Sequence, residues 1–307
     1  MSNVATMQAV RLAHLSDVHL TSRPLGWQWR DWFSKRLTGW INSRVLSRRR
    51  RFRRADEVLR VLIADLGSQR RPDCVIFSGD ATMLGFPGEL ARAAAALGVG
   101  STAMPPGLAV PGNHDYYTPA VERSGGFENY FAPWLDGQRL DEGPIYPFAR
   151  KVGPVWLVGV NSCSGNRWPW NAVGRVGDAQ LHRLGRLLET LGPGPRILVT
   201  HYPVGLADGQ PEGPLHRLRD LDDLLVVAER GGVSLWLHGH RHDPYRLNDP
   251  RVAPFPVICA GSATQSGHWG YNEYTIDGLH LQGVRRTFDL DRRCFRDSET
   301  FELKLRS

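Results

Sequence analysis

The sequence predicts an α/β fold in which sheets are covered by helices, and two observations support this prediction. Short apolar runs of strand length alternate along the chain with longer segments whose apolar residues recur at helical spacing. Several of the apolar runs are followed at once by Asp, Asn or His, and the carboxyl ends of strands are where α/β proteins collect ligands. We therefore expect a polar site at one edge of the sheets.

The first third of the chain contains three predicted strands and three predicted helices. The strands are short apolar runs that end in polar turns, and they cover residues 9–15, 74–78 and 108–111. The helices are an amphipathic segment rich in Trp and Arg, a segment that follows an Arg run, and an Ala-rich segment, and they cover about 29–48, 52–66 and 86–97.

The rest of the chain continues this alternation and then changes character. Strands are predicted at 155–160, 196–200 and 234–237, with helices between them at 178–191 and 221–229. Polar and apolar residues alternate at 271–276 and 279–284, as is typical of β-hairpins. We interpret 1–307 as a single domain with a basic Trp-rich insertion at about 23–54 and a peripheral β-rich tail from about 265.

The composition is that of a globular protein, with 41% hydrophobic and 22% charged residues among 307. The sequence contains no run of eighteen apolar residues and no visible secretory signal. The four cysteines form no CxxC pair. We therefore expect a cytoplasmic location, with the alternative of peripheral attachment to the inner face of the membrane.

Five short motifs place potential metal ligands at predicted strand ends: SDVH at 16–19, SGD at 78–80, GNHD at 112–115, THYP at 200–203 and HGHRH at 238–242. The candidate ligands are carboxylates, one amide and imidazoles, namely Asp17, His19, Asp80, Asn113, His201, His238 and His240. Mixed oxygen and nitrogen ligands suit transition metals such as Mn, Fe or Zn rather than Ca. Seven ligands are too many for one tetrahedral site, so we expect two adjacent ions.

The ordered motif set resembles that of the calcineurin-like metallophosphoesterases, over roughly residues 11–262. The resemblance implies a four-layer α/β/β/α sandwich with two packed mixed sheets flanked by helices. It implies that one ion is held by Asp17, His19, Asp80 and His240, and the second by Asp80, Asn113, His201 and His238. It also implies hydrolysis of phosphoric esters or anhydrides by activated water, with Asp80 as the bridging ligand.

Three further residues have expected roles. His114 resembles the family histidine that donates a proton to the leaving group or binds phosphate, and we expect Asp115 to orient its imidazole. Arg241, between two candidate ligands, is the best remaining candidate for binding substrate phosphate. We expect the other histidines to be turn or cap residues, although two of them, His242 and His268, could line the cleft: His14, His182, His216, His242 and His268.

The insertion at 23–54 contains eleven Lys or Arg and one acid, a net charge of +10, whereas the remainder of the chain carries −3. Its residues Trp29, Trp32, Phe33, Leu37, Trp40 and Ile41 follow the spacing of one helix face. This face either packs on the core, or lies at an anionic membrane surface through residues 27–54. Nucleic-acid binding is the least favoured of the three alternatives.

The substrate class depends on this insertion. Its segment WFSKRLTGWINSRVL is similar to one in the branch of the family that hydrolyses the pyrophosphate of UDP-2,3-diacylglucosamine at the membrane surface. Better-known lipid A hydrolases of the superfamily have Arg at the position of His114, so this chain departs from them. We expect a phosphate-containing small-molecule or lipid substrate. The alternatives are cyclic or other nucleotides, phosphoproteins, and a catalytically silent binding scaffold.

Overall fold

A computed structural model of the chain describes residues 9–45, 48–140 and 143–306, so residues 46–47 of the predicted insertion lie outside the described residues. The first sheet has the strand order β12-β11-β10-β1-β2-β3. Its strands are β1 (Val10–Leu15), β2 (Cys74–Phe77), β3 (Gly107–Ala109), β10 (Gly270–Asp277), β11 (His280–Asp289) and β12 (Cys294–Lys304). The strand β1 pairs parallel with β2 and antiparallel with β10, so this sheet is mixed.

The second sheet also has six strands, in the order β4-β5-β6-β7-β9-β8. They are β4 (Phe148–Val152), β5 (Val155–Gly159), β6 (Arg196–Val199), β7 (Val233–His238), β8 (Tyr245–Leu247) and β9 (Val257–Cys259). The four central strands are parallel, and β4 and β8 are antiparallel to them at the two edges. These parallel strands are buried, which explains why they are continuous apolar runs in the sequence.

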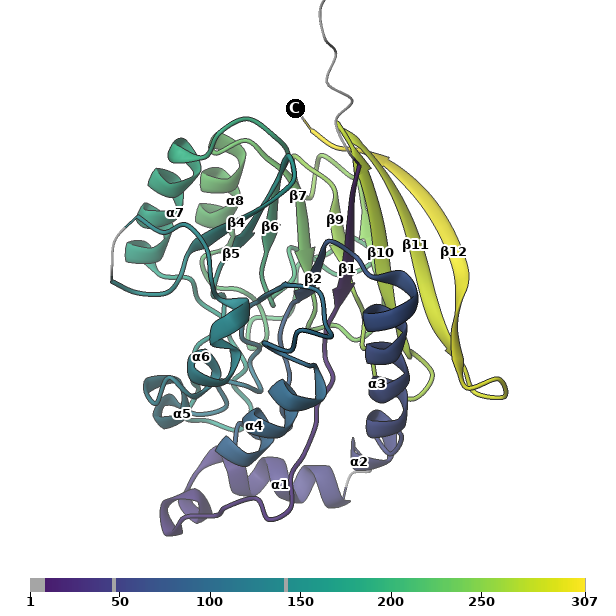
Figure 1. Cartoon of the computed structure of the whole chain (residues 1–307). Helices are drawn as coiled ribbons and strands as arrows, with labels where there is room; N and C mark the ends of the chain where they lie inside the picture. Colours follow the sequence, from purple (N-terminus) through teal and green to yellow (C-terminus); the bar gives the residue numbers. More distant parts are fainter. Residues whose placement is uncertain (1–8, 46–47, 141–142, 307) are drawn as a thin grey trace, which may run out of the picture.

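Helices cover the outer faces of the two packed sheets (Figure 1). The second sheet is covered by α7 (Asp178–Thr190) and α8 (Leu221–Arg230), and α3 (Ala55–Ala64) and α4 (Pro87–Ala96) lie on the side of the first sheet. Shorter elements are α2 (Arg48–Arg51), α5 (Pro119–Arg123), α6 (Gly126–Phe131), η2 (Asp65–Arg70) and η3 (Ala132–Trp134). One cluster of buried apolar residues includes side chains from both sheets. The predicted α/β/β/α architecture is therefore confirmed.

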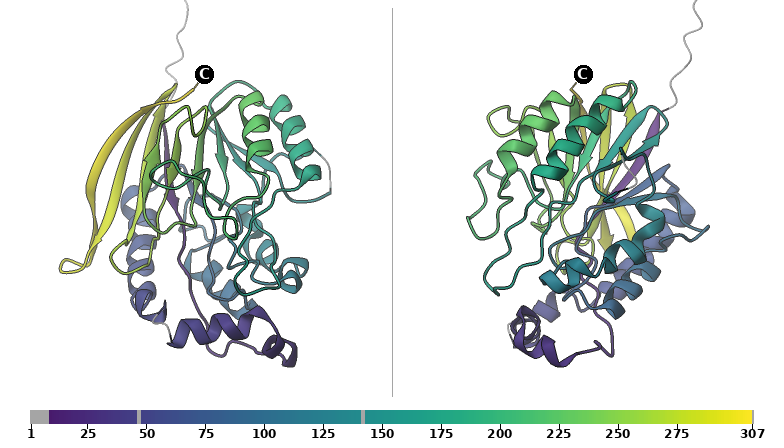
Figure 2. Two further views of the ribbon diagram at one scale, coloured as in Figure 1. Left: turned by 180° about the vertical axis from the view of Figure 1, so that it is seen from behind. Right: turned by 90° about the vertical axis from the view of Figure 1, so that its left-hand side faces the viewer.

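The predicted helix at 29–48 is interrupted in the structure. A short helix, η1 (Trp29–Phe33), is followed by α1 (Lys35–Val45), and Ser34 between them has an extended backbone. The Ser34 hydroxyl accepts a hydrogen bond from the backbone N–H of Arg36 at 3.2 Å, as is typical of a serine at a helix N-terminus. Both helices lie at the end of the molecule toward which β1 and β7 run (Figures 1 and 2).

The tail forms β-structure as predicted, but it is not peripheral throughout. The strand β10 lies inside the first sheet, between β1 and β11, and pairs with β1 over residues 272–276. Only β11 and β12 extend the sheet outward from it. The tail therefore helps to hold β1, the strand that leads into the first motif.

Candidate metal centre

Loops at the carboxyl ends of the parallel strands carry the polar motifs and are bonded to one another. The loop after β1 runs beside the loop after β2, since the backbone N–H groups of Asp17 and His19 donate to the carbonyls of Gly79 (2.9 Å) and Asp80 (3.0 Å). From the loop after β9, the hydroxyls of Ser262 and Thr264 donate to the carbonyls of Asp17 (2.6 Å) and Val18 (2.7 Å). Three widely separated segments of sequence are thereby fixed together.

The glycines of three motifs allow this close approach. A Cβ atom on Gly112 would lie 2.1 Å from Oδ1 of Asp80, and one on Gly239 would lie 2.0 Å from the Ser16 hydroxyl. A Cβ atom on Gly79 would lie 2.6 Å from the backbone nitrogen of Gly112. Side chains at these positions would push the loops apart, so the glycines are required by packing.

The backbone at the site is strained at several residues. Among the described residues, seven that are not glycine have a positive φ, and five of them belong to the motifs: Asp17, His19, Asp80, His240 and His242, with φ between 45° and 70°. This left-handed conformation is unfavourable for L-residues and concentrates at functional sites, where the surrounding structure imposes it.

A first group of side chains converges on one point. Asp17, His19, Asp80 and His242 each offer a ligand atom, and these atoms lie within 4.8 Å of one another. Nε2 of His19 lies 3.1 Å from Nε2 of His242 and 3.4 Å from Oδ2 of Asp80. Oδ1 of Asp17 is buried, accepts no hydrogen bond within the described part of the chain, and lies 3.3 Å from Nε2 of His242.

Hydrogen bonds on the far side of the rings orient both imidazoles. Nδ1 of His19 faces the carbonyl of Thr82 at 3.2 Å, and Nδ1 of His242 faces Oε1 of Gln265 at 2.6 Å. Since these oxygens only accept, each Nδ1 carries the proton and each Nε2 of a neutral ring presents a lone pair. This arrangement is typical of metal-binding histidines.

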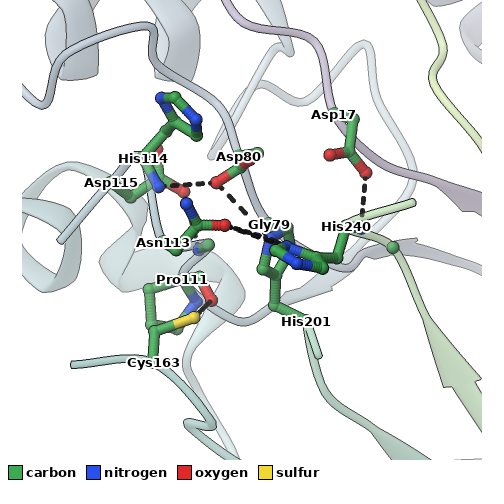
Figure 3. A network of polar contacts seen from close by, with 12 residues as sticks. Asp17, Gly79, Asp80, Pro111, Asn113, His114, Asp115, Cys163, His201 and His240 are labelled. Atoms are coloured by element: carbon green, nitrogen blue, oxygen red, sulfur yellow. Dashed lines mark hydrogen bonds and ion pairs between the residues drawn. The ribbon is translucent and has the colours of Figure 1, made fainter. Parts of the chain in front are cut away.

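A second group lies beside the first and shares Asp80 with it (Figure 3). Oδ1 of Asn113 lies 3.1 Å from Nε2 of His201 and 3.0 Å from Nδ1 of His240. Oδ1 of Asp80 is 3.5 Å from Nε2 of His201, whereas its Oδ2 faces His19. Asp80 thus directs one carboxylate oxygen toward each group.

The structure corrects the assignment of the last two histidines. From the sequence, His238 and His240 were predicted as ligands, and His242 as a turn or cap residue that could line the cleft. Instead, His240 joins Asn113 and His201, and His242 joins Asp17 and His19. His238 is the last residue of β7, and its Nε2 is buried without a hydrogen-bond partner in the described residues. The two histidines that face the site, His240 and His242, follow the end of β7 and are shifted by two positions from the predicted pair.

Burial keeps the imidazoles of the second group neutral. It lowers the pKa of His201 and of His240 below the usual value, so both rings are free to act as ligands at neutral pH. In the first group, burial alone would raise the pKa of Asp17, but the adjacent His242 and His19 lower it well below its usual value. The same carboxylate, acting against burial, raises the pKa of His242.

His114 and Asp115 are both at the site, but not in the predicted relationship. Nδ1 of His114 faces the carbonyl of Met83 at 2.7 Å, so Met83 supplies the orienting acceptor. The Asp115 carboxylate accepts from the backbone N–H groups of Thr82 (2.9 Å), Gly112 (2.9 Å) and Ala81 (3.2 Å). Asp115 therefore joins the loops after β2 and β3, and burial together with Asp80 raises its pKa to about 7.

Arg241 is turned away from the predicted role. Its guanidinium donates to Oε1 of Glu212 at 2.5 Å. Arg241 is not among the described residues that line the cavity next to Asp80 and Asn113. The same Glu212 oxygen lies 3.7 Å from Nε2 of His240. Glu212 and Gln265 are site residues that the sequence analysis missed, because each lies in a loop with no recognisable pattern.

A cavity of about 330 Å³ opens over both groups. Its floor contains Asp80, Asn113, His114, His240 and His242. Its walls come from α1 of the insertion and from the loop at 169–172.

The insertion presents some of its aromatic side chains to solvent, whereas Trp27 and Trp40 pack against the core. Trp29 is 70% exposed, Trp32 53% and Phe33 87%, whereas the charged Asp31, Lys35 and Arg36 are buried. The guanidinium of Arg36 bonds to Asp31 and to the carbonyls of Leu84 and Gly85. In the described residues, no helix is both long and apolar enough to span a bilayer.

Comparisons with known proteins agree with this geometry. A family model described as calcineurin-like phosphoesterase matches residues 10–244. The structure is similar to a dimetal phosphatase from Danio rerio, with 15% identity and a TM-score of 0.65, covering 96% of this chain and 98% of that one.

Two further solved structures are similar. One is purple acid phosphatase PPD1 from yellow lupin (Lupinus luteus) seeds, with 15% identity, a TM-score of 0.61 and coverage of 97% of this chain and 54% of that one. The other is GAP50, the anchor in the inner membrane complex of Plasmodium, with 12% identity, a TM-score of 0.57 and coverage of 97% and 90%. At these identities the likeness establishes the fold alone. No significant match was found among curated proteins.

Proposed function

Because the chain belongs to the calcineurin-like phosphoesterase family, we propose that this metal-dependent phosphoesterase hydrolyses a phosphodiester or pyrophosphate with two bound metal ions. The observation that carries the proposal is the shared carboxylate: Asp80 lies 3.4 Å from Nε2 of His19 through one oxygen and 3.5 Å from Nε2 of His201 through the other.

The described residues fit two ions. The Nε2 atoms of His19 and His242 face one another with lone pairs, and no residue in the described part of the chain donates a hydrogen bond to the buried Oδ1 of Asp17. One ion would be held by Asp17, His19, Asp80 and His242, and the second by Asp80, Asn113, His201 and His240. Bound there, Mn, Fe or Zn would supply Lewis-acid charge for polarising the phosphoryl group and activating water.

The protein's own residues would complete the reaction. The Met83 carbonyl holds Nδ1 of His114, and the imidazole would give a proton to the leaving oxygen. Tyr117, whose ring centre lies 5.3 Å from that of His114, covers one side of the imidazole. Asp115 acts through the backbone, by holding the loop that carries Asn113 and His114 against the loop after β2.

Hydrolysis of bis-p-nitrophenyl phosphate with added Mn²⁺ tests the proposal. We expect turnover by the wild type and its loss in His201→Ala, because that ring is a ligand of the second ion. Metal-loaded protein that cleaves neither this diester nor UDP-2,3-diacylglucosamine nor cyclic AMP would contradict the proposal, and would favour a binding scaffold.

We further propose that the substrate is lipid-linked and is met at an anionic membrane surface, as for UDP-2,3-diacylglucosamine. The support is the exposure of Trp29, Trp32 and Phe33 in η1, directly before the helix that lines the cavity, together with exposed arginines at positions 23, 30, 50, 51 and 53. Tryptophan and arginine are the residues that interfacial helices place against lipid headgroups. This proposal implies a cytoplasmic, peripheral membrane location.

A second exposed aromatic pair borders the same opening. Trp168 and Trp170 are 60% and 61% exposed and stack with ring centres 5.3 Å apart. Pro169 between them lines the cavity that α1 also lines. Aromatic residues on both sides of the opening would let the membrane surface cover it while a headgroup enters.

A further inference from the structure

One face of α1 forms a wall of the catalytic cavity. The cavity-lining residues Lys35, Thr38, Gly39 and Asn42 follow the spacing i, i+3, i+4 and i+7, which places them on one side of the helix. The cavity is also lined by Pro169, Ala172 and His216, which lie outside this helix. The insertion therefore contributes directly to the site, in addition to presenting aromatic residues outside it.

Gly39 allows this helix to pack closely against the site. A Cβ atom on Gly39 would lie 2.0 Å from the hydroxyl oxygen of Tyr117 and 2.9 Å from a methyl carbon of Leu84. Gly39 therefore lets α1 pack directly on the loop that carries His114. The position of the helix relative to the metal ligands is set by this contact.

Lys35, one helical turn before Gly39, brings a cation into the cavity. The residue is only 7% exposed. Its ammonium group donates to the carbonyl of Asn171 at 3.0 Å and lies 4.9 Å from the centre of the Tyr117 ring. That ring is in turn 5.3 Å from the ring of His114. Lys35 of α1 thus contacts the loop at 169–172 and lies near His114, the proposed proton donor.

The charges around the cavity are complementary to a substrate with more than one anionic group. Asp80 is the only acid among its described lining residues, and bound metal ions would neutralise that carboxylate. The ions would bind the phosphoryl group that is attacked, which leaves Lys35 to meet a second group. A lysine ammonium is a compact point charge, and its attraction to phosphate is screened less in a buried site than at the surface.

We propose that Lys35 binds the second phosphate of a diphosphate substrate and so makes the site prefer phosphoanhydrides over substrates with a single phosphate. This inference rests on the proposed hydrolase function and adds to it a specificity-determining residue in the insertion. Asn42 and His216, which line the same cavity, supply further donors to that phosphate.

The test measures binding of ADP and AMP to Mn²⁺-loaded protein by isothermal titration calorimetry, at one fixed free Mn²⁺ concentration. ADP is supplied as its α,β-methylene analogue, which the enzyme cannot hydrolyse to AMP. We expect the wild type to bind ADP more tightly than AMP. Lys35→Met should weaken ADP binding by about tenfold, the loss typical of a hydrogen bond between charged groups, and leave AMP binding nearly unchanged. Lys35→Arg should keep part of the preference, because it retains the charge.

A matched control is Lys151→Met on β4, which removes an exposed lysine elsewhere and should behave as the wild type. If Lys35→Met does not fold, Lys35→Gln is used in its place, because glutamine keeps a hydrogen-bond donor for the Asn171 carbonyl. Equal binding of the two nucleotides by the wild type, or an equal loss of both in the variant, would overturn the proposal. Calorimetry needs no turnover, so this outcome is distinct from a failure to hydrolyse bis-p-nitrophenyl phosphate.

Discussion

Nε2 of His19 and Nε2 of His242 lie 3.1 Å apart, although the two residues are 223 positions apart in the sequence. Both rings donate through Nδ1, to the Thr82 carbonyl and to Oε1 of Gln265, so neutral rings would direct two lone pairs at each other. Such a contact is repulsive unless a cation lies between the nitrogens. Burial lowers the pKa of His242, but Asp17 outweighs burial and raises it, which favours a proton on that ring when no metal is bound. A metal ion would replace that proton.

This relationship distinguishes His242 from His238 as a ligand. In His242→Gln the ion bound by Asp17, His19 and Asp80 loses a ligand, and its affinity should fall by more than the roughly 10–100-fold lost when only an outer partner of a ligand is removed. His238→Gln, the matched variant, should retain both ions. Metal content after dialysis, measured by elemental analysis, decides between the two. Loss of an ion in His238→Gln alone would restore the assignment made from the sequence.

Most of the fold could be predicted because its signals are local. The buried parallel strands β2 and β6 are apolar runs bounded by turn residues, and α7 carries leucines at helical spacing, so both types of element are visible in short windows. The position of β10 beside β1 was missed, because pairing across some 260 residues depends on tertiary contacts that no local pattern encodes.

The site could be predicted to the level of its motifs but not of every atom. In HGHRH, histidines at 238, 240 and 242 have the same period-two spacing, so spacing alone does not say which two face the metals. The end of β7 at His238 and the left-handed backbone of His240 and His242 decide it. Gln265 and Glu212 are fixed by contacts with the ligand histidines, and neither contact has a sequence signature.

His114 should matter most for poor leaving groups. Its Nδ1 donates to the Met83 carbonyl, which orients the ring, and we expect the ring to protonate the leaving oxygen. His114→Ala should keep both metal ions and lower kcat by roughly 10²–10⁴ on alkyl phosphodiesters, with a small effect on p-nitrophenyl esters, whose leaving group needs no proton. Equal losses on the two ester classes would show that His114 instead binds phosphate or supports the fold.

Gly39 should be intolerant of a methyl group. In Gly39→Ala the new Cβ would meet the Tyr117 hydroxyl at 2.0 Å, so the helix must move and the free energy of unfolding should fall by about 1–3 kcal/mol. Gly185→Ala on α7 is the matched control: its Cβ would be 3.8 Å from Val227, and it should stabilise by about 0.5–1 kcal/mol. Tyr117→Phe, which removes the clashing oxygen, should partly rescue Gly39→Ala. Urea denaturation checks all three, and equal stabilisation by the two alanines would refute the packing argument.

His14 should make the metal-free protein less stable in acid. Burial first, then the charges of His238 and Arg285, lower its pKa to about 3. An unfolded chain protonates this histidine near pH 6.5, so the unfolded state binds more protons and stability is lost as pH falls below that value. Between pH 7.5 and 5 the loss from His14 should be about 2 kcal/mol.

Urea denaturation of chelator-treated protein at these two pH values checks the expectation. His14→Gln should show a smaller decrease than the wild type, because the group that takes up the proton is absent. The exposed His182 on α7 provides the matched control as His182→Gln. An unchanged decrease in His14→Gln would assign the acid sensitivity to other groups.

The aromatic residues of η1 should control binding to anionic membranes. Phe33 and Trp29 are 87% and 70% exposed, and transferring such side chains from water to the lipid interface gains roughly 1.5–3 kcal/mol for each one fully buried. Trp29→Ala/Phe33→Ala should therefore lower sedimentation with phosphatidylglycerol vesicles by at least about tenfold, while hydrolysis of bis-p-nitrophenyl phosphate stays unchanged.

The control variant Tyr130→Ala/Val226→Ala removes exposed apolar residues on α6 and α8 and should bind vesicles as the wild type does. Raising the salt concentration should weaken wild-type binding, because salt screens the attraction between the exposed arginines and the anionic lipids. Equally tight binding to neutral and anionic vesicles would contradict a role of the arginines in membrane binding. No binding to any vesicle would contradict the membrane proposal and would indicate that the exposed aromatic residues bind a protein partner.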